Sequence, residues 1–308
     1  MSRRLLPILL VLLLGALALP AAAITYGEPD AGEHPYVGML FFYDPTEIDS
    51  RFTDPGAWFS CSGTLVSPTV VLTAGHCVYG VGLNGEPATT GGNDIWVTFR
   101  ESNSLVGLPP STDYIPDGNQ QRYLDRVRWF KGSRDWVRGT AIPYEGYGLG
   151  FPNTGDIGVV ILDKPVRSRT FGALPDLGYL DGLAGAPGQH RDDLLVETVG
   201  YGMLEVHPVY DPNWYDARYK ATSTIVNLGS ALTDGYNLHT SNNASAVGGA
   251  GGSCFGDSGG PVFAGTTSNV VVAVVSFGMN GNCKGADFSY RTDIAIAQDF
   301  LARFGVTP

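Results

Sequence analysis

Charged side chains are scarce in this chain of 308 residues. They make up 16% of the sequence, and the 30 acidic residues outnumber the 19 Lys and Arg. A protein that binds nucleic acid needs a basic face to neutralise phosphates, so nucleic acid is not an expected partner. Hydrophobic residues make up 44% of the chain, which is enough for a packed core, so disorder is not expected either.

Metal-binding motifs are also missing. The sequence has no Cys-x-x-Cys and no His-Glu-x-x-His, which argues against zinc, and no Asp-x-Asp-x-Asp-Gly loop of the kind that binds calcium. We therefore expect no metal and no cofactor. The four cysteines are an even number, which in an exported chain indicates disulfides and allows three pairings.

Long apolar runs are absent except at the N-terminus. There, Arg3 and Arg4 precede the apolar stretch 8–19, and the alanines at 21–23 form a small-residue cleavage site. This pattern predicts a signal peptide over 1–23 and a secreted, extracellular protein without membrane contact after cleavage. A membrane anchor over 5–24 is the alternative, which Pro7 and Pro20 disfavour. Cleavage would remove Arg3 and Arg4, so the mature chain would keep 19 − 2 = 17 basic residues against 30 acidic ones.

The 42 Gly and 20 Pro residues punctuate short apolar runs, so turns and strands should dominate and the class is all-β. Residues 62–73 place two apolar runs around a Ser-Pro turn, which predicts a hairpin. Further strands are predicted at 95–99, 157–162, 195–201, 262–264 and 270–277. From Ile294 the apolar positions recur at helical spacing, with Thr292 or Asp293 able to cap the helix and Gly305 able to end it.

Three short segments carry the chemistry. Residues 256–261 read Gly-Asp-Ser-Gly-Gly-Pro, which exposes Ser258 on a tight turn where its oxygen can attack. Residues 71–77 end in Ala-Gly-His-Cys, and residues 156–162 begin with Asp156. Gly-x-Ser-x-Gly also occurs in α/β-hydrolases, but there the acid and the histidine follow the serine. All five histidines of this chain precede Ser258, which excludes that fold.

The order His76, Asp156, Ser258 and the local sequences around these residues resemble the chymotrypsin/trypsin-like serine peptidase family, from about Ile24 to the C-terminal helix. The resemblance implies two six-stranded antiparallel β-barrels with the active site between them. The first would span 24–165, and the second, with the terminal helix, 166–308. It also implies the disulfides Cys61–Cys77 and Cys254–Cys283.

The same resemblance assigns catalytic roles. Ser258 would be the nucleophile and His76 the base, with Asp156 orienting the imidazole. The backbone N–H groups of Gly256 and Ser258 would form the oxyanion hole. Asp257 has no partner in the local sequence, and the family pairs this carboxylate with a new N-terminal amine, which cleavage after Ala23 would supply at Ile24. We therefore expect export itself to produce the active form.

Residue preference is harder to read from the sequence. The resemblance places a specificity pocket at Gly252, Ser253, Ser276, Phe277 and Gly278. No carboxylate stands at Gly252, which favours an apolar or aromatic substrate side chain. Two alternatives stay open at this point: Phe288 could shorten the pocket, or Asp287 could enter it and restore a preference for basic residues. Val275 argues against a preference for acidic residues, because glutamate-specific relatives carry histidine there.

The segment 80–154 is long for this family and rich in aromatic residues, so it either shapes the cleft or packs for its own stability. Taken together, the sequence predicts a monomeric secreted serine endopeptidase that cleaves polypeptides through an acyl-enzyme intermediate. Two alternatives are a catalytically silent binding protein with the same fold and an esterase that uses the same triad.

Overall fold

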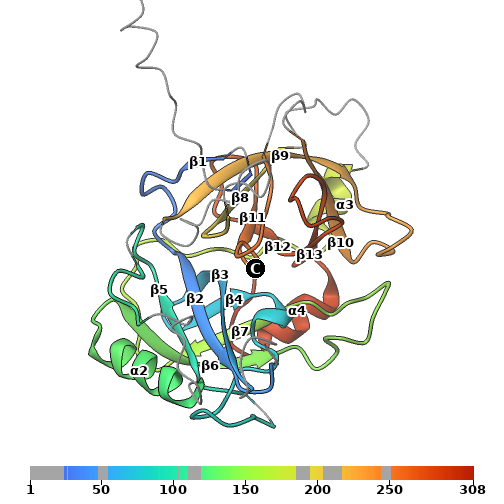
Figure 1. Cartoon of the computed structure of the whole chain (residues 1–308). Helices are drawn as coiled ribbons and strands as arrows, with labels where there is room; N and C mark the ends of the chain where they lie inside the picture. The colour runs from blue at the N-terminus through green and yellow to red at the C-terminus, as the bar shows by residue number, and fades with distance from the viewer. Residues whose placement is uncertain are drawn as a thin grey trace, which may run out of the picture.

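The computed structural model describes residues 24–25, 27–47, 55–89, 91–102, 104–109, 119–184, 195–203, 217–243 and 251–308. The signal peptide predicted over 1–23 lies outside these residues. The first group of strands closes into a barrel in the order β2-β3-β4-β7-β6-β5 (Figure 1). Its strands are β2 (Val37–Asp44), β3 (Ala57–Ser67), β4 (Val70–Thr73), β5 (Ile95–Thr98), β6 (Trp136–Pro143) and β7 (Gly158–Leu162).

The second group follows the order β9-β10-β13-β12-β11-β8, and β8 also pairs with β9, which closes the ring. Its strands are β8 (Leu195–Gly200), β9 (Tyr219–Asn227), β10 (Asn237–Asn242), β11 (Pro261–Ala264), β12 (Val271–Gly278) and β13 (Gly285–Arg291). All strand pairs in both barrels are antiparallel. The predicted all-β fold of two six-stranded barrels is confirmed.

The helices are few and short in the described ranges: η1 (Gly75–Cys77), α2 (Asn119–Gly132), α3 (Tyr179–Ala184) and α4 (Ala295–Ala302). None of them has the length and apolar character that a membrane-spanning helix requires. The predicted C-terminal helix is present, and Gly305 follows it with a φ of 75°. The predicted side-chain cap is wrong: Ile294 is the N-cap residue, because Asp293 instead binds Arg291 and the Leu180 N–H, and the Thr292 hydroxyl donates to the Val271 carbonyl.

Each terminal segment of the described chain packs on the barrel that the other half of the chain forms. The short strand β1 (Glu28–Pro29) pairs with β9 of the second barrel, whereas α4 lies beside the first barrel (Figure 1). The Phe300 ring packs against Tyr144, and Arg303 forms an ion pair with Glu145 at 2.8 Å. The divide that the sequence predicts at 165/166 falls between β7 and β8, but each terminal segment contacts the barrel formed by the other half of the chain.

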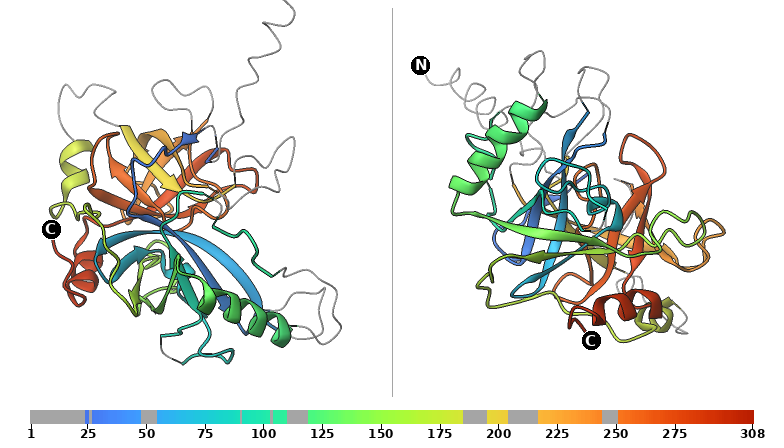
Figure 2. Two further views of the ribbon diagram at one scale, coloured as in Figure 1. Left: turned by 90° about the vertical axis from the view of Figure 1, so that its left-hand side faces the viewer. Right: turned by 90° about the horizontal axis from the view of Figure 1, so that it is seen from below.

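Part of the 80–154 segment packs into the first barrel. Helix α2 lies along the outer side of this barrel, away from the second one (Figures 1 and 2). Its Phe130 is 1% exposed, and its ring centroid lies 4.7 Å from that of Trp96 and 5.0 Å from that of Trp136. Phe41 of β2 and Trp58 of β3 each lie 5.8 Å from the same ring. These aromatic residues of the segment therefore build the core.

We expect Phe130→Ala to lower the free energy of unfolding by about 3–5 kcal/mol, because the change leaves a cavity among four packed aromatic rings. Urea unfolding followed by tryptophan fluorescence measures this loss. The matched control is Leu124→Ala in the same helix, whose side chain is 47% exposed. The control should change stability by less than about 1 kcal/mol. Equal losses in the two variants would contradict the assignment of α2 to the core of the first barrel.

Candidate active site

His76 and Asp156 meet at the edge of the first barrel. His76 lies in the short helix η1, directly after β4, and Asp156 precedes β7, the strand that pairs with β4. Both Asp156 oxygens lie close to His76 Nδ1, at 3.0 and 3.1 Å, and Oδ1 also accepts the His76 backbone N–H at 2.9 Å. Asp156 thus fixes both the backbone and the ring of the histidine, as a tautomer-setting partner must.

A third group completes the environment of Asp156. The Ser276 hydroxyl, from β12 of the second barrel, donates to Asp156 Oδ2 at 2.5 Å. Burial of Asp156 disfavours its charge, but the charge and hydrogen bonds of His76 and the bond from Ser276 outweigh burial and lower the pKa of Asp156. Burial also opposes protonation of His76, yet the charge of Asp156 prevails and raises the His76 pKa. Asp156 therefore stabilises the imidazolium that forms when His76 takes up a proton.

Ser258 lies on the turn before β11 and lines the pocket beside Ser276. Its carbonyl oxygen accepts the Ser62 N–H at 2.8 Å and lies 3.5 Å from Cys77 Sγ, which places the turn next to η1. No hydrogen bond joins the Ser258 and His76 side chains, both of which are described. Such bonds are often long in proteins without substrate and tighten when substrate binds.

The turn holds two free donors beside Ser258. Gly256 has a φ of 97°, a conformation that side-chain-bearing residues rarely adopt. The Ser62 hydroxyl donates to the Gly256 carbonyl at 3.0 Å and fixes this peptide. Within the described part of the chain, neither the Gly256 nor the Ser258 backbone N–H has a hydrogen-bond partner. Both predicted oxyanion-hole donors are therefore available to a ligand.

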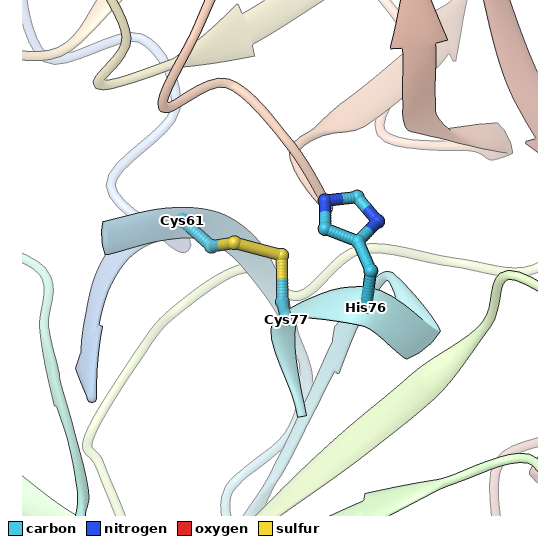
Figure 3. A group of neighbouring side chains, drawn as sticks. All are labelled: Cys61, His76 and Cys77. Carbon is cyan, nitrogen blue, oxygen red and sulfur yellow. A yellow bond between two sulfur atoms is a disulfide. The ribbon is translucent and has the colours of Figure 1, made fainter. Parts of the chain in front are cut away.

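The four cysteines form the two pairs that the family resemblance implies. Cys61–Cys77 joins β3 to η1, and Figure 3 shows the His76 ring on the η1 turn beside this disulfide. Cys254–Cys283 joins the serine turn to the segment before β13. Among the described residues, the one group of possible metal ligands is Cys61, His76 and Cys77. Cysteine binds a metal as a thiolate, but Cys61 and Cys77 form a disulfide, so this group does not fit a metal.

The Asp257 carboxylate lies against the residues that follow β8. It is fully buried and accepts the backbone N–H groups of Gly202, at 2.7 Å, and Cys254, at 2.9 Å. Burial and the nearby charge of Asp287 raise the pKa of Asp257 to about 7, although both hydrogen bonds favour the charged form. No ion pair with Asp257 occurs among the described residues. A cation next to this carboxylate would stabilise it strongly.

Ile24, the residue predicted to pair with Asp257, is also fully buried. The next residue, Thr25, forms an isolated bridge with Gly252, whose N–H donates to the Thr25 carbonyl at 3.1 Å. The start of the predicted mature chain is therefore inserted into the second barrel close to the pocket. Ile24 has a φ of 52°, which is rare for a β-branched residue.

A cavity of about 260 Å³ opens beside Ser258. Four of the five predicted pocket residues line it, namely Ser253, Ser276, Phe277 and Gly278. Gly252, predicted as the floor, is not among the lining residues: a Cβ there would lie 2.5 Å from Asp287 Oδ2. Asp287 lines the cavity instead, so the premise of an uncharged pocket is wrong. Phe288 does not line the cavity, because its ring stacks between Phe277 and His239.

Sequence reasoning missed several residues that support the site. Ser62 donates to the Gly256 carbonyl and accepts the Tyr201 N–H, which ties the serine turn to both barrels. Gly202 supplies a backbone donor to Asp257, and Ser276 holds Asp156 in addition to lining the pocket. These roles depend on pairs of residues 55 to 194 positions apart, for which a single sequence gives no local signal.

The fold and this arrangement define a chymotrypsin-like protein. The family model described as Trypsin matches residues 28–103 and 141–301, and the chain belongs to this family. Among solved structures, human heparin binding protein is similar, with a TM-score of 0.54 and 14% identity over 91% of this chain and 96% of that one. An atomic-resolution structure of HBP gives 0.55 and 16%, over 92% and 98%. These identities establish the fold alone, and no curated protein matches the chain.

Asp156→Asn should lower the pKa of His76, because the substitution removes the negative charge that raises it. NMR titration of the His76 ring protons measures the pKa in both proteins. Asp135→Asn is a control, since Asp135 lies in an exposed ion pair with Arg100. An unchanged His76 pKa in Asp156→Asn would contradict the electrostatic coupling of the pair.

Proposed function

We propose that this protein is a secreted serine endopeptidase that hydrolyses peptide bonds through an acyl-enzyme intermediate. The observation that carries the proposal is the contact of Asp156 with both the backbone N–H and Nδ1 of His76, next to a turn that presents Ser258. A serine hydroxyl is a poor nucleophile at neutral pH and requires a base held in one tautomer. The buried Asp156 carboxylate supplies that constraint.

In the proposed reaction, Ser258 Oγ attacks the carbonyl carbon of the scissile bond while His76 Nε2 takes its proton. The negative charge that forms on the carbonyl oxygen is bound by the N–H groups of Gly256 and Ser258. The intermediate collapses as His76 returns the proton to the leaving amine, and the acyl group stays on Ser258. Water, deprotonated by His76, then attacks the ester and releases the acid, which regenerates the hydroxyl of Ser258.

Apolar side chains around the cavity favour a polypeptide substrate over a small ester. Phe255 and Met279, which line the cavity, are 52% and 60% exposed. Phe151 is 56% exposed, and its ring centroid lies 5.5 Å from that of Phe277. An extended peptide covers such a surface on both sides of the scissile bond, whereas a small ester would leave it in water.

A second candidate function is binding without catalysis, because the chain shares its fold with human heparin binding protein. Two observations count against a similar role for this chain. Its formal net charge is −11, which disfavours a polyanionic ligand, and His76, Asp156 and Ser258 are all present.

A serine-directed fluorophosphonate tests the proposed function. The correctly processed protein should be labelled at Ser258, and Ser258→Ala should lose labelling and reduce peptide hydrolysis by about 10⁴–10⁶-fold. Mass spectrometry of the labelled peptide identifies the site, and heat-denatured protein controls for non-specific reaction. An unlabelled Ser258 in folded, processed protein would favour the binding protein. Labelling with cleavage of esters but not of peptides would favour the esterase.

We also propose that the amine of Ile24, released by cleavage after Ala23, pairs with Asp257. The burial of Ile24 and the bridge from Thr25 to Gly252 already hold this segment in the second barrel. Cleavage removes the peptide unit that defines the φ of Ile24 and creates an ammonium, which we propose reaches the buried Asp257 carboxylate. The ammonium would lower the pKa of Asp257 and stabilise the serine turn.

Adding one glycine before Ile24 should therefore abolish most of the activity, because the amine is displaced from Asp257. Loss of one partner of a buried ion pair costs about 3–5 kcal/mol, which corresponds to a decrease in kcat/KM of about 10²–10⁴-fold. Assays of the two purified proteins measure the difference, and N-terminal sequencing of the secreted protein identifies the natural start. Full activity of the extended protein, or a start other than Ile24, would contradict the proposal.

A further inference from the structure

Basic side chains gather in one short segment of an otherwise acidic protein. Of the 19 Lys and Arg residues of the chain, five lie within 119–134, whereas this segment holds one of the 30 acidic residues. The rest of the chain therefore has 19 − 5 = 14 basic residues against 30 − 1 = 29 acidic ones. Most of the segment is helix α2, which falls between the two ranges of the family match, so the common pattern of the family does not include it.

Two of the five cations belong to the interior. Arg122 and Arg126 are 6% and 5% exposed. Arg126 Nε donates to the Pro109 carbonyl at 2.9 Å, and its guanidinium lies over the rings of Phe41 and Trp58. Burial and the charge of Arg122 lower the pKa of Arg126 to about 10. The helix therefore already carries an electrostatic cost, and further cations on its outer side add to the repulsion within it.

The other three cations are exposed, namely Arg128, Lys131 and Arg134. The Arg128 side chain is 77% exposed and pairs with Asp125 at 3.0 Å. Within the described ranges, the side chains of Lys131 and Arg134 have no hydrogen bond and no ion pair. A lysine in the last turn stabilises a helix through its dipole, which accounts for Lys131. The same reason does not apply to Arg134, which follows the helix, so this charge has no role within the fold.

The exposed side of α2 forms a continuous stripe. Residues three and four apart share one face of a helix, so Leu124, Arg128 and Lys131 lie in line over about 10 Å. Leu124 is 47% exposed and adds an apolar contact to the stripe. Helix α2 lies along the outer side of the first barrel, away from the second barrel, whose residues 253–287 line the cavity beside Ser258 (Figures 1 and 2). A partner bound to α2 would therefore leave the cleft open.

We propose that Arg128, Lys131 and Arg134 form a docking surface for a short acidic segment of a polypeptide partner. Clustered arginines bind carboxylates through charge-assisted hydrogen bonds, and an extended segment of about three residues spans the stripe. At physiological salt, charges more than about 8 Å away are screened, so the acidic remainder of the protein does not repel so short a ligand. A membrane or a long polyanion would extend beyond the stripe and meet that acidic remainder. The surface does not require the proposed peptidase function.

Fluorescence anisotropy with two labelled peptides tests the docking surface. One peptide carries the run Glu-Glu-Leu-Glu-Glu, and the other has glutamine in place of each glutamate. The processed full chain carries Ser258→Ala, so that neither peptide is cleaved. At low ionic strength we expect the glutamate peptide to bind at least about tenfold more tightly, as three exposed ion pairs allow, and the difference to shrink as salt is added. Equal affinity for the two peptides would overturn the proposal.

Removing the three charges locates the contact. A variant that combines Arg128→Gln, Lys131→Gln and Arg134→Gln should bind both peptides equally. The matched control changes the net charge by the same amount at three other exposed cations and should keep the preference for glutamate. It combines Lys164→Gln, Arg167→Gln and Arg169→Gln. An equal loss in the two variants would mean that binding follows net charge, which contradicts a surface on α2.

Hydrogen exchange on the chain with α2 unchanged maps the contact without any substitution in the helix. The glutamate peptide should slow exchange of the backbone amides over 124–134, because a bound segment reduces the local opening of the helix. Slower exchange confined to other parts of the chain would overturn the assignment. This measurement also decides the matter if the triple variant of α2 does not fold.

Two further measurements separate this surface from a lipid site and from the peptidase function. Sedimentation with vesicles of phosphatidylserine and phosphatidylcholine in equal amounts should leave the protein in solution at physiological salt. Vesicle binding that requires the three cations, together with equal affinity for the two peptides, would replace the polypeptide by a membrane and overturn the proposal. The triple variant of α2, with Ser258 intact, should be labelled by the fluorophosphonate as fast as the unmodified protein. If neither is labelled but the glutamate peptide is preferred, the peptidase function fails and the docking surface stands.

Discussion

The contacts of Asp156 couple the two barrels to each other and to the candidate active site. The carboxylate receives its hydrogen bonds from His76, at the end of the β4 hairpin in the first barrel, and from Ser276, on β12 of the second. A buried carboxylate is costly unless it is paired and hydrogen-bonded. The same contacts that satisfy the charge therefore fix the orientation of the imidazole and the approach of the barrels. A shift of one barrel against the other would disturb the histidine and expose the charge together.

Three buried carboxylates lie around the serine turn, and they differ in what compensates them. Asp156 has a cationic partner, and its pKa is lowered. Asp257 and Asp287 have only neutral donors among the described residues, and their pKa values are raised to about 7 and about 6. A paired carboxylate is suited to hold a neighbour in place, whereas an incompletely compensated one is suited to receive a cation from outside. The chemistry of each position therefore follows from its neighbours more than from the residue type.

The parts of the structure that the sequence predicted are those with local signals. The hairpin of β3 and β4 surrounds a Ser-Pro turn, and the three motif residues lie in short characteristic segments. Strand β2 gives no alternating pattern, because its residues are buried on both faces of the sheet. The sequence of α2 has no clear apolar face, because Arg126 lies on the buried side of the helix, over the rings of Phe41 and Trp58. The place of Asp287 in the pocket depends on its pairing with Gly278 across two strands. Asp293 does not cap the terminal helix as expected, because its carboxylate binds Arg291.

The crossing of the two termini has a consequence for how the molecule comes apart. The N-terminal segment is held in the second barrel by β1 and by Asp30, which bonds to both His34 and Arg218 in the protein interior. The C-terminal helix is held on the first barrel by Phe300 and Arg303. Each half of the chain therefore has a terminal segment that packs on the barrel formed by the other half. A protease that nicked the connection between β7 and β8 would yield two fragments that remain associated, so the molecule could tolerate cleavage there without losing its shape.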